Sequence, residues 1–279
     1  MRLLVTIPHY YRRDLARGFY GSEIDGLPAR VAAVTRCLAA LHQTFGSRHL
    51  LSGVNPAPAN TNLAFELDVF LVTTAHDHLA SQLPPALFRH FPVGVPPRVL
   101  GFACHKLMQY HAAGYDWFAY LEDDIEVTDA LLFDKLAWFS ARFGHKVLLQ
   151  PNRFEVADRW EVVKLYVDGG MMEPEQAVRF QDLAARPLLT AELFGRPLRF
   201  RRVPNVHAGC FFASAAQMAV LAADPAFGEP TDAFIGPLES AATLPVMRCF
   251  DVYKPARENA AFLEVRHLGR RFLPEEPGA

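Results

Sequence analysis

Short apolar runs alternate with amphipathic stretches along the first half of the chain. Residues 3–7 read Leu-Leu-Val-Thr-Ile, and comparable runs follow at 69–73, 117–121 and 147–149. Runs of this length, rich in β-branched and aromatic residues, are typical of strands buried on both faces of a parallel sheet. The pattern therefore predicts that the first half of the chain builds the strands of one such sheet.

Amphipathic helices are predicted between these strands. Apolar side chains recur in steps of three and four residues over 28–45, and Gly46 follows as a typical helix end. A second helix is predicted over about 99–113. A third is predicted after Thr128, whose hydroxyl would cap it. Strand, helix and strand in this order form the start of a βαβ unit.

The second half mixes strand and helix patterns. We expect strands near 162–167, 200–203 and 210–213, a helix over about 174–185, and a further helix capped by Ser214. No repeat or clear linker separates the two halves. The prediction is therefore one α/β domain over 1–279, with a Rossmann-like, mostly parallel sheet flanked by helices and a mixed antiparallel addition in the C-terminal half.

Charge and composition narrow the possible partners. The net charge of −2 and the pI of about 6.6 provide no global basic field, so nucleic acid is not an expected partner. No apolar run approaches the roughly 20 residues that span a bilayer, and the four cysteines lack CxxC spacing. We expect a cytoplasmic protein with at most peripheral membrane contact, through basic runs such as 199–202 and 266–271.

Three adjacent carboxylates follow the most aromatic of the strand runs. They are Glu122, Asp123 and Asp124, hereafter the acidic trio. In open α/β sheets, ligands bind beyond the carboxyl ends of the strands. Adjacent carboxylates repel one another unless a cation, hydrogen-bond donors or water relieve them, and hard oxygen ligands suit Mg²⁺ or Mn²⁺. The position therefore predicts a metal or ligand site, although acids that merely cap a loop are an alternative.

The segment around the acidic trio carries a family resemblance. Residues 106–127 comprise a helix, Gly114, a hydrophobic strand, the acidic trio and a second short strand. This order resembles the DxD region of GT-A glycosyltransferases, including its EDD variant. The resemblance implies that Asp124, together with Asp123, binds Mn²⁺ or Mg²⁺. It also implies that Glu122 and Asp123 approach the ribose or sugar of a nucleotide-sugar donor.

A segment near residue 239 resembles the part of GT-A enzymes that supplies the catalytic base. Residues 234–240 read Phe-Ile-Gly-Pro-Leu-Glu-Ser. The resemblance implies that Glu239 takes the proton of the acceptor hydroxyl, with Asp232 as the second candidate. Many family members carry Glu-Asp where this chain has Glu-Ser. Glu239 could equally be an acid favoured at a helix start by the macrodipole.

Two further segments resemble parts of the donor site. Residues 207–214 contain Gly209, which the resemblance places beside the donor sugar, and residues 265–269 contain His267, which it offers to the metal or the diphosphate. A turn before a core strand is an equal interpretation of the first segment. Other histidines, His9 among them, have weaker claims because none forms a zinc-ligand pattern.

Nucleotide contacts are expected near the first strand. By the same resemblance, Thr6, Pro8 and Arg12 would hold the base and ribose, and Lys106 would contact the nucleotide from the helix before the acidic trio. These positions follow from the order of elements in the family.

Together these inferences predict a metal-dependent glycosyltransferase of the hexosyltransferase type. It would move a sugar from a nucleotide-sugar to a hydroxyl of a glycan or small-molecule acceptor. A UDP-sugar is the first candidate for the donor, and inversion of the anomeric configuration is favoured. Residues 1–145 would bind the nucleotide-sugar and residues 146–279 the acceptor. A nucleotidyltransferase is an alternative, although such enzymes normally carry a Gly-rich loop after the first strand, and here no glycine precedes Gly18. A non-catalytic binding protein of the same fold is another.

Overall fold

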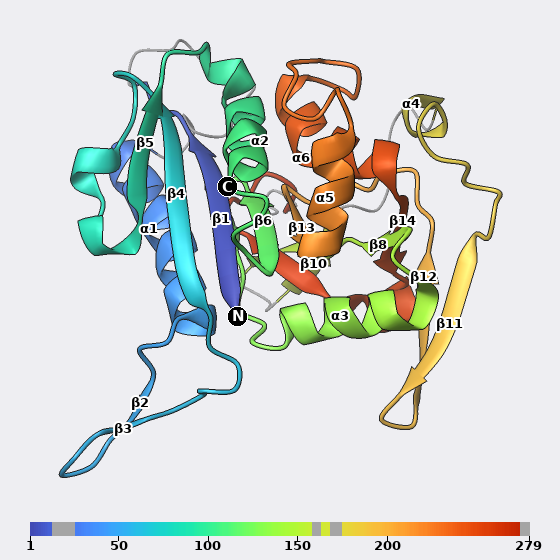
Figure 1. The fold of residues 1–279 in the computed structure, drawn as a ribbon, viewed down its shortest axis with the longest axis horizontal. Helices are drawn as coiled ribbons and strands as arrows, with labels where there is room; N and C mark the ends of the chain where they lie inside the picture. Colours follow the sequence, from blue (N-terminus) through green and yellow to red (C-terminus); the bar gives the residue numbers. More distant parts are fainter. Residues whose placement is uncertain (13–25, 158–162, 168–174, 274–279) are drawn as a thin grey trace, which may run out of the picture.

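A central five-stranded sheet organises the chain. The computed structural model describes residues 1–12, 26–157, 163–167 and 175–273. The strand order is β13-β6-β1-β4-β5 (Figure 1), with β1 Arg2–His9, β4 Glu66–Thr74, β5 Arg89–Val93, β6 Trp117–Leu121 and β13 Cys210–Ser214. Strands β6, β1, β4 and β5 are parallel, whereas β13 runs antiparallel to β6. This confirms the predicted α/β class, a mostly parallel sheet with an antiparallel addition from the C-terminal half.

The strand order reverses beside β1. The chain passes from β1 to β4 and β5 on one side, then returns to place β6 on the other side of β1. The register pairs Thr6 with Phe70 on one neighbour and with Tyr120 on the other. The carboxyl ends of β1 and β6 therefore form a topological switch point, where open α/β sheets bind their ligands.

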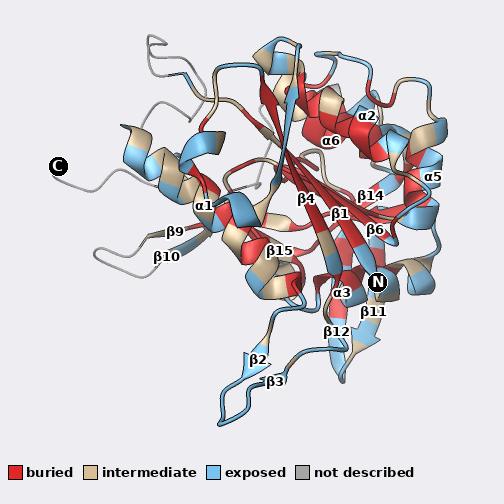
Figure 2. Cartoon of the chain, turned by 60° about the vertical axis from the view of Figure 1, so that its left-hand side comes forward, coloured by how far each residue is buried: buried red, intermediate tan, exposed pale blue. Residues whose placement is uncertain are grey.

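Two layers of helices cover the sheet. On one face α1 Gly26–Phe45 and α3 Leu132–Phe143 pack against it, and on the other lie α2 Leu100–Tyr110, α5 Ala215–Ala223 and α6 Pro237–Cys249. Successive strand side chains alternate between faces, so Leu3 and Val5 pack towards α1 while Leu4 packs towards α2. Figure 2 shows β1, β4 and β6 as buried. Burial on both faces explains why these strands read as continuous apolar runs.

Two smaller sheets extend the molecule beyond β6. One has the order β10-β9-β15-β7 and the other β11-β12-β14-β8. Their strands are β7 Ile125–Glu126, β8 Val147–Leu149, β9 Asn152–Ala157, β10 Val163–Tyr166, β11 Leu188–Leu193, β12 Arg196–Arg201, β14 Asp251–Pro255 and β15 Glu264–His267. Strand β15 pairs antiparallel with β7, which sets His267 opposite Ile125. This pairing brings the C-terminal region to the acidic trio.

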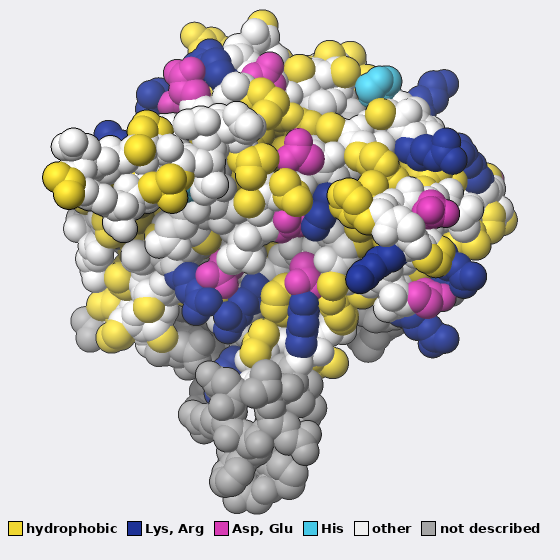
Figure 3. All heavy atoms as spheres, turned by 90° about the horizontal axis from the view of Figure 1, so that it is seen from below, with side chains coloured by type: hydrophobic (Ala, Val, Ile, Leu, Met, Phe, Trp, Pro, Cys, Tyr) yellow, Lys and Arg dark blue, Asp and Glu magenta, His cyan; other side chains and the backbone are white. Residues whose placement is uncertain are grey.

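The remaining elements are short. A two-stranded ribbon of β2 Leu50–Leu51 and β3 Ala57–Pro58 projects from the body and is exposed (Figure 2). Short 3-10 turns lie at Ala80–Gln82, Pro85–Leu87, Pro97–Val99 and Arg257–Phe262, and α4 spans Glu175–Val178. Within the described part of the chain, no helix is long and apolar enough to cross a membrane. On the face seen in Figure 3, charged side chains of both signs are scattered among apolar ones.

Several predicted elements differ in the structure. Helix α3 starts at Leu132 and not after Thr128, because Asp129 instead accepts the backbone N–H of Leu131 in a turn, at 3.0 Å. The helix predicted over 174–185 is only the single turn α4. Strand β5 is an element for which the sequence analysis predicts no strand, and its place at the sheet edge tolerates Pro92.

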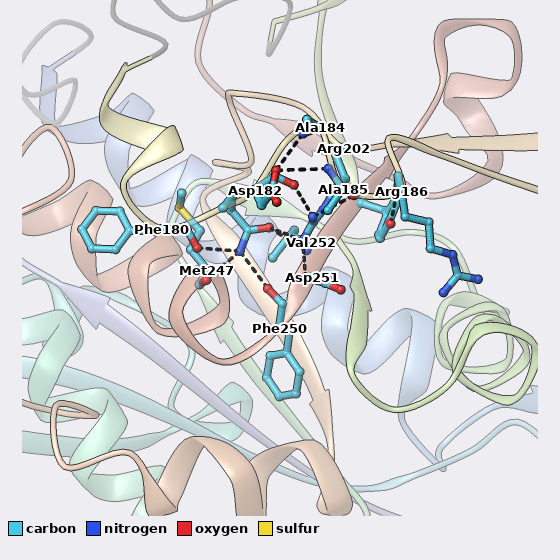
Figure 4. A network of polar contacts seen from close by, with 12 residues as sticks. Phe180, Asp182, Ala184, Ala185, Arg186, Arg202, Met247, Phe250, Asp251 and Val252 are labelled. Carbon is cyan, nitrogen blue, oxygen red and sulfur yellow. Dashed lines mark hydrogen bonds and ion pairs between the residues drawn. The ribbon is translucent and has the colours of Figure 1, made fainter.

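A buried polar network follows the short helix α4. The Gln181 amide donates to the carbonyls of Met247 at 2.6 Å and Phe250 at 2.8 Å, and its oxygen accepts the N–H of Val252 at 3.0 Å. Arg202 donates to the carbonyl of Ala185 at 3.0 Å, as the close view in Figure 4 shows. These contacts tie the segment after α4 to the end of α6 and the start of β14.

Candidate active site

The acidic trio begins in a tight turn at the end of β6. The Glu122 N–H donates to the Gly209 carbonyl at 2.7 Å, and the Ile125 N–H donates to the Glu122 carbonyl at 3.1 Å. Gly209 has a φ of +65°, and a Cβ atom there would lie 2.7 Å from Glu122 Oε2. The sequence predicts close backbone approach at Gly209, and the group that approaches it in the structure is the side chain of Glu122.

Asp123 is held by two cationic or polar partners. His9 Nδ1 lies 2.5 Å from Asp123 Oδ2, and the Arg30 guanidinium contacts Asp123 Oδ1. The N–H of Leu79 donates to His9 Nε2 at 3.0 Å, so the proton of this fully buried ring sits on Nδ1 and is donated to Asp123. Both carboxylate oxygens of Asp123 are therefore occupied. Asp123 thus links β1, α1 and β6, and its role as a metal ligand stays a prediction.

Asp124 faces His267, and the family resemblance offers both residues to the metal site. Asp124 Oδ2 lies 3.5 Å from His267 Nε2 and 3.7 Å from the Arg30 guanidinium. Asp124 Oδ1 is buried and has no hydrogen-bond partner among the described residues. The Asp124 carbonyl accepts the N–H of Leu268 at 2.9 Å, and Glu155 Oε1 lies 2.8 Å from His267 Nδ1. Backbone and side-chain contacts thus hold this pair face to face.

The charges of the site are unevenly distributed. Burial and the charge of Asp124 raise the pKa of Glu122 to about 8. Burial alone would raise the pKa of Asp124, but the hydrogen bond and charge of His267, with Arg30, hold it well below its usual range. Burial opposes the charge of His267, yet its hydrogen bonds to Asp124 and Glu155 raise its pKa to about 9. Near neutral pH, Asp124 therefore carries more of the negative charge of the site than Glu122 does.

The N-terminal part of α6 approaches the acidic trio from the other side. His207 Nε2 lies 3.9 Å from Glu122 Oε1, and His207 Nδ1 lies 2.8 Å from the Thr243 hydroxyl. Glu239 is four residues before Thr243, on the same side of the helix, and its charge contributes to the raised pKa of Glu122. Glu239 is thus near enough for its charge to act on Glu122, and its role as the base stays a prediction. Asp232 is exposed in the segment before α6.

The residues predicted to contact the nucleotide lie in different environments. Thr6 is fully buried inside the sheet beside Cys104 of α2, so its side chain is covered in this structure, and its nucleotide contact stays a prediction. Lys106 lies on the exposed side of α2, 3.2 Å from Glu229. Pro8 is half-buried near the end of β1, and Arg12 is exposed just beyond it.

A divalent cation fits one pair of side chains. Among the described residues no three His, Cys, Asp or Glu side chains are grouped to hold a metal. Asp124 and His267 nevertheless offer a buried carboxylate oxygen without a partner and an imidazole nitrogen facing the same carboxylate. Mn²⁺ or Mg²⁺ on these two ligands would need further oxygens from a bound molecule or water. Two protein ligands would leave coordination positions open for such oxygens.

The fold and site together define an α/β protein with an acidic site at its topological switch point. No protein-family model matches the chain, and no curated protein sequence matches it. Among solved structures it is similar to Staphylococcus aureus TarS 1–349, with a TM-score of 0.49 and 11% identity over 95% of this chain and 60% of that one. The same TarS fragment in complex with UDP matches at a TM-score of 0.48 and 9% identity, with the same coverage. The fragment in complex with UDP-GlcNAc matches at a TM-score of 0.45 and 11% identity, over 95% of this chain and 58% of that one. The chain spans about three-fifths of TarS 1–349, at an identity too low to transfer an activity.

Proposed function

We propose that this chain is a glycosyltransferase that binds a nucleotide-sugar, with a divalent cation between Asp124 and His267. The observation that carries the proposal is this pair itself, 3.5 Å apart at the switch point of the sheet, with one Asp124 oxygen buried and unpartnered among the described residues. A buried anionic oxygen without a donor is costly, and a cation would satisfy it. A catalytic cation site with open positions also suits a diphosphate.

The proposed chemistry assigns a task to each neighbouring side chain. The cation, when bound, would neutralise the leaving nucleoside diphosphate. Glu239 would accept the proton of the acceptor hydroxyl while that oxygen bonds to the anomeric carbon and the bond from this carbon to the phosphate oxygen breaks. His207, whose Nδ1 atom lies 2.8 Å from the Thr243 hydroxyl, would lie beside Glu122 and next to the donor sugar. Attack opposite the leaving group would invert the anomeric centre.

Binding and turnover can be measured separately. Isothermal titration with UDP, with and without Mn²⁺, tests the site, and a screen of UDP-sugars for hydrolysis or transfer tests the reaction. We expect Asp124→Asn to abolish Mn²⁺-dependent UDP binding while the fold is retained. Asp129→Asn removes a nearby carboxylate that pairs with Lys135 at 2.6 Å, and serves as the matched control. Equal UDP affinity of wild type and Asp124→Asn in Mn²⁺ would rule out the assignment.

A non-catalytic binding protein is the second candidate, and the surroundings of Asp123 favour it. His9 and Arg30 already satisfy that carboxylate, and Arg30 also lies 3.7 Å from Asp124. A site neutralised by its own side chains has less need of a cation for stability. UDP binding without any donor hydrolysis or transfer would support this candidate over the enzyme.

A further inference from the structure

Glu155 is a fully buried carboxylate behind the proposed cation site. It lies on β9, which runs parallel to β15 with Phe154 opposite Arg266, and this register sets Glu155 beside His267. Its Oε1 atom lies 2.8 Å from His267 Nδ1. Its Oε2 atom accepts the backbone N–H groups of Phe272 at 3.0 Å and Leu273 at 3.1 Å. Every oxygen of this carboxylate is therefore engaged.

The two backbone contacts restrict what the carboxylate can do. A buried carboxylate is costly unless donors satisfy its oxygens. Because two N–H groups fix Oε2, the side chain cannot rotate without breaking them, and Oε1 stays directed at His267. An oxygen that accepts from Nδ1 fixes the proton on that nitrogen, so the other ring nitrogen, Nε2, is the one that faces Asp124.

We propose that Glu155 is a positioning residue that fixes the orientation of His267, so that Nε2 is presented to a cation beside Asp124. The inference rests on the proposed function for the cation, but the orientation of the ring can be tested without it. A carboxylate behind a ligating imidazole holds the ring and strengthens it as a ligand, and its loss typically costs about 10–100-fold in metal affinity. Glu155 itself touches neither cation nor substrate.

Glu155→Gln tests the proposal with little change in volume. A glutamine has one oxygen and one NH₂ group, and two backbone N–H groups compete with a single ring N–H for that oxygen. The oxygen should therefore stay with the backbone, which turns the NH₂ group towards His267 Nδ1. We expect the Mn²⁺ dissociation constant, measured from the electron paramagnetic resonance signal of free Mn²⁺, to rise about 10–100-fold. We also expect the downfield NMR resonance of the His267 Nδ1–H, present in the metal-free wild type, to be lost. Glu155→Asp, which keeps the charge, should recover part of both signals.

Glu264→Gln is the matched control, because Glu264 lies on β15 and contacts Lys164 and Tyr166 and not His267. It should leave Mn²⁺ affinity and the His267 resonance unchanged. Wild-type Mn²⁺ affinity in folded Glu155→Gln, or an unchanged His267 resonance, overturns the proposal. If the wild type binds no Mn²⁺, the cation in the proposed function fails, and the His267 resonance still decides whether Glu155 orients the ring. If Glu155→Gln does not fold, the same measurements on Glu155→Asp decide, with intermediate values expected.

Discussion

The Nδ1 atom of His9 lies 2.5 Å from Oδ2 of Asp123, and this contact joins the ends of β1 and β6 across the switch point. The two residues are 114 positions apart in the chain. Leu79 donates to the other ring nitrogen, so the ring is held from both sides. The middle acid of the acidic trio is thereby part of the scaffold, while Asp124 is left to face His267.

Replacing His9 by Leu should destabilise the protein strongly. The change leaves Asp123 Oδ2 and the N–H of Leu79 without partners in a buried position, so we expect the free energy of unfolding to fall by about 2–4 kcal/mol. Urea unfolding of wild type and variant measures this loss. His145→Leu, at an exposed position, is the control and should stay within about 0.5 kcal/mol. A similarly small loss for His9→Leu would mean that the contact contributes little to the scaffold.

Replacing Gly209 by alanine should destabilise the protein for two reasons that can be measured separately. Gly209 and Gly195 both have positive φ, +65° and +71°, but a Cβ at Gly195 meets nothing within 4 Å. Gly195→Ala therefore measures the backbone cost alone, about 1–2 kcal/mol. Gly209→Ala adds the clash of its Cβ with Glu122 and Ile125, so its loss in urea unfolding should be larger by at least about 1 kcal/mol. Equal losses for the two variants would argue against a tight fit between Gly209 and Glu122.

The elements that the sequence predicts well are those with local signals. Strand β6 matches its predicted bounds because a five-residue apolar run is buried on both faces, and the capping box at Ser214 defines the start of α5. The acidic trio was found because its acids are adjacent and follow that strand. In each case, neighbouring residues carry the information.

The rest of the site depends on contacts between distant residues. Arg30 and Asp123 are 93 positions apart, and Glu155 and His267 are 112 apart. Arg30 lies in an amphipathic helix without a motif of its own. The contact of Glu155 with His267 is evident only once the pairing of β9 with β15 is known. His9 belongs to no sequence motif, although its position at the end of β1, level with the acidic trio at the end of β6, is an available signal. Spacing alone does not show which strand ends meet.

Acid should destabilise the protein through His105. This ring is fully buried, stacked on Phe227 at 4.7 Å between ring centroids, and burial lowers its pKa to about 3. Between its ordinary pKa of 6.5 and this lower value, the unfolded chain binds the proton and the folded protein does not, so stability falls as the pH falls. The slope from this group is at most about 1.4 kcal/mol per pH unit.

His105→Phe separates this effect from the other titrations. Phenylalanine keeps the aromatic volume and does not titrate, so the difference in unfolding free energy between pH 7 and pH 5 should be smaller in the variant. Urea unfolding at the two pH values, on both proteins, gives the comparison. An unchanged difference would show that His105 does not contribute to acid sensitivity.

Replacing Glu239 distinguishes a catalytic role of this residue from a purely structural one. It lies in the first turn of α6, where an acid is favoured by the helix macrodipole, and also near Glu122, whose pKa its charge helps to raise. A base that acts only as the acceptor is deprotonated stabilises the transition state far more than the bound donor. Glu239→Gln should therefore leave the dissociation constant of the nucleotide-sugar unchanged and lower kcat by about 10²-fold or more. As a helix-start acid alone, it would instead change stability by at most about 1 kcal/mol and leave turnover near normal.

Asp134→Asn, in the first turn of α3, is the control that measures the size of such a helix-start effect. Donor affinity, turnover and melting temperature, measured on the same preparations, decide between the two roles, and near-normal turnover of Glu239→Gln would shift attention to Asp232.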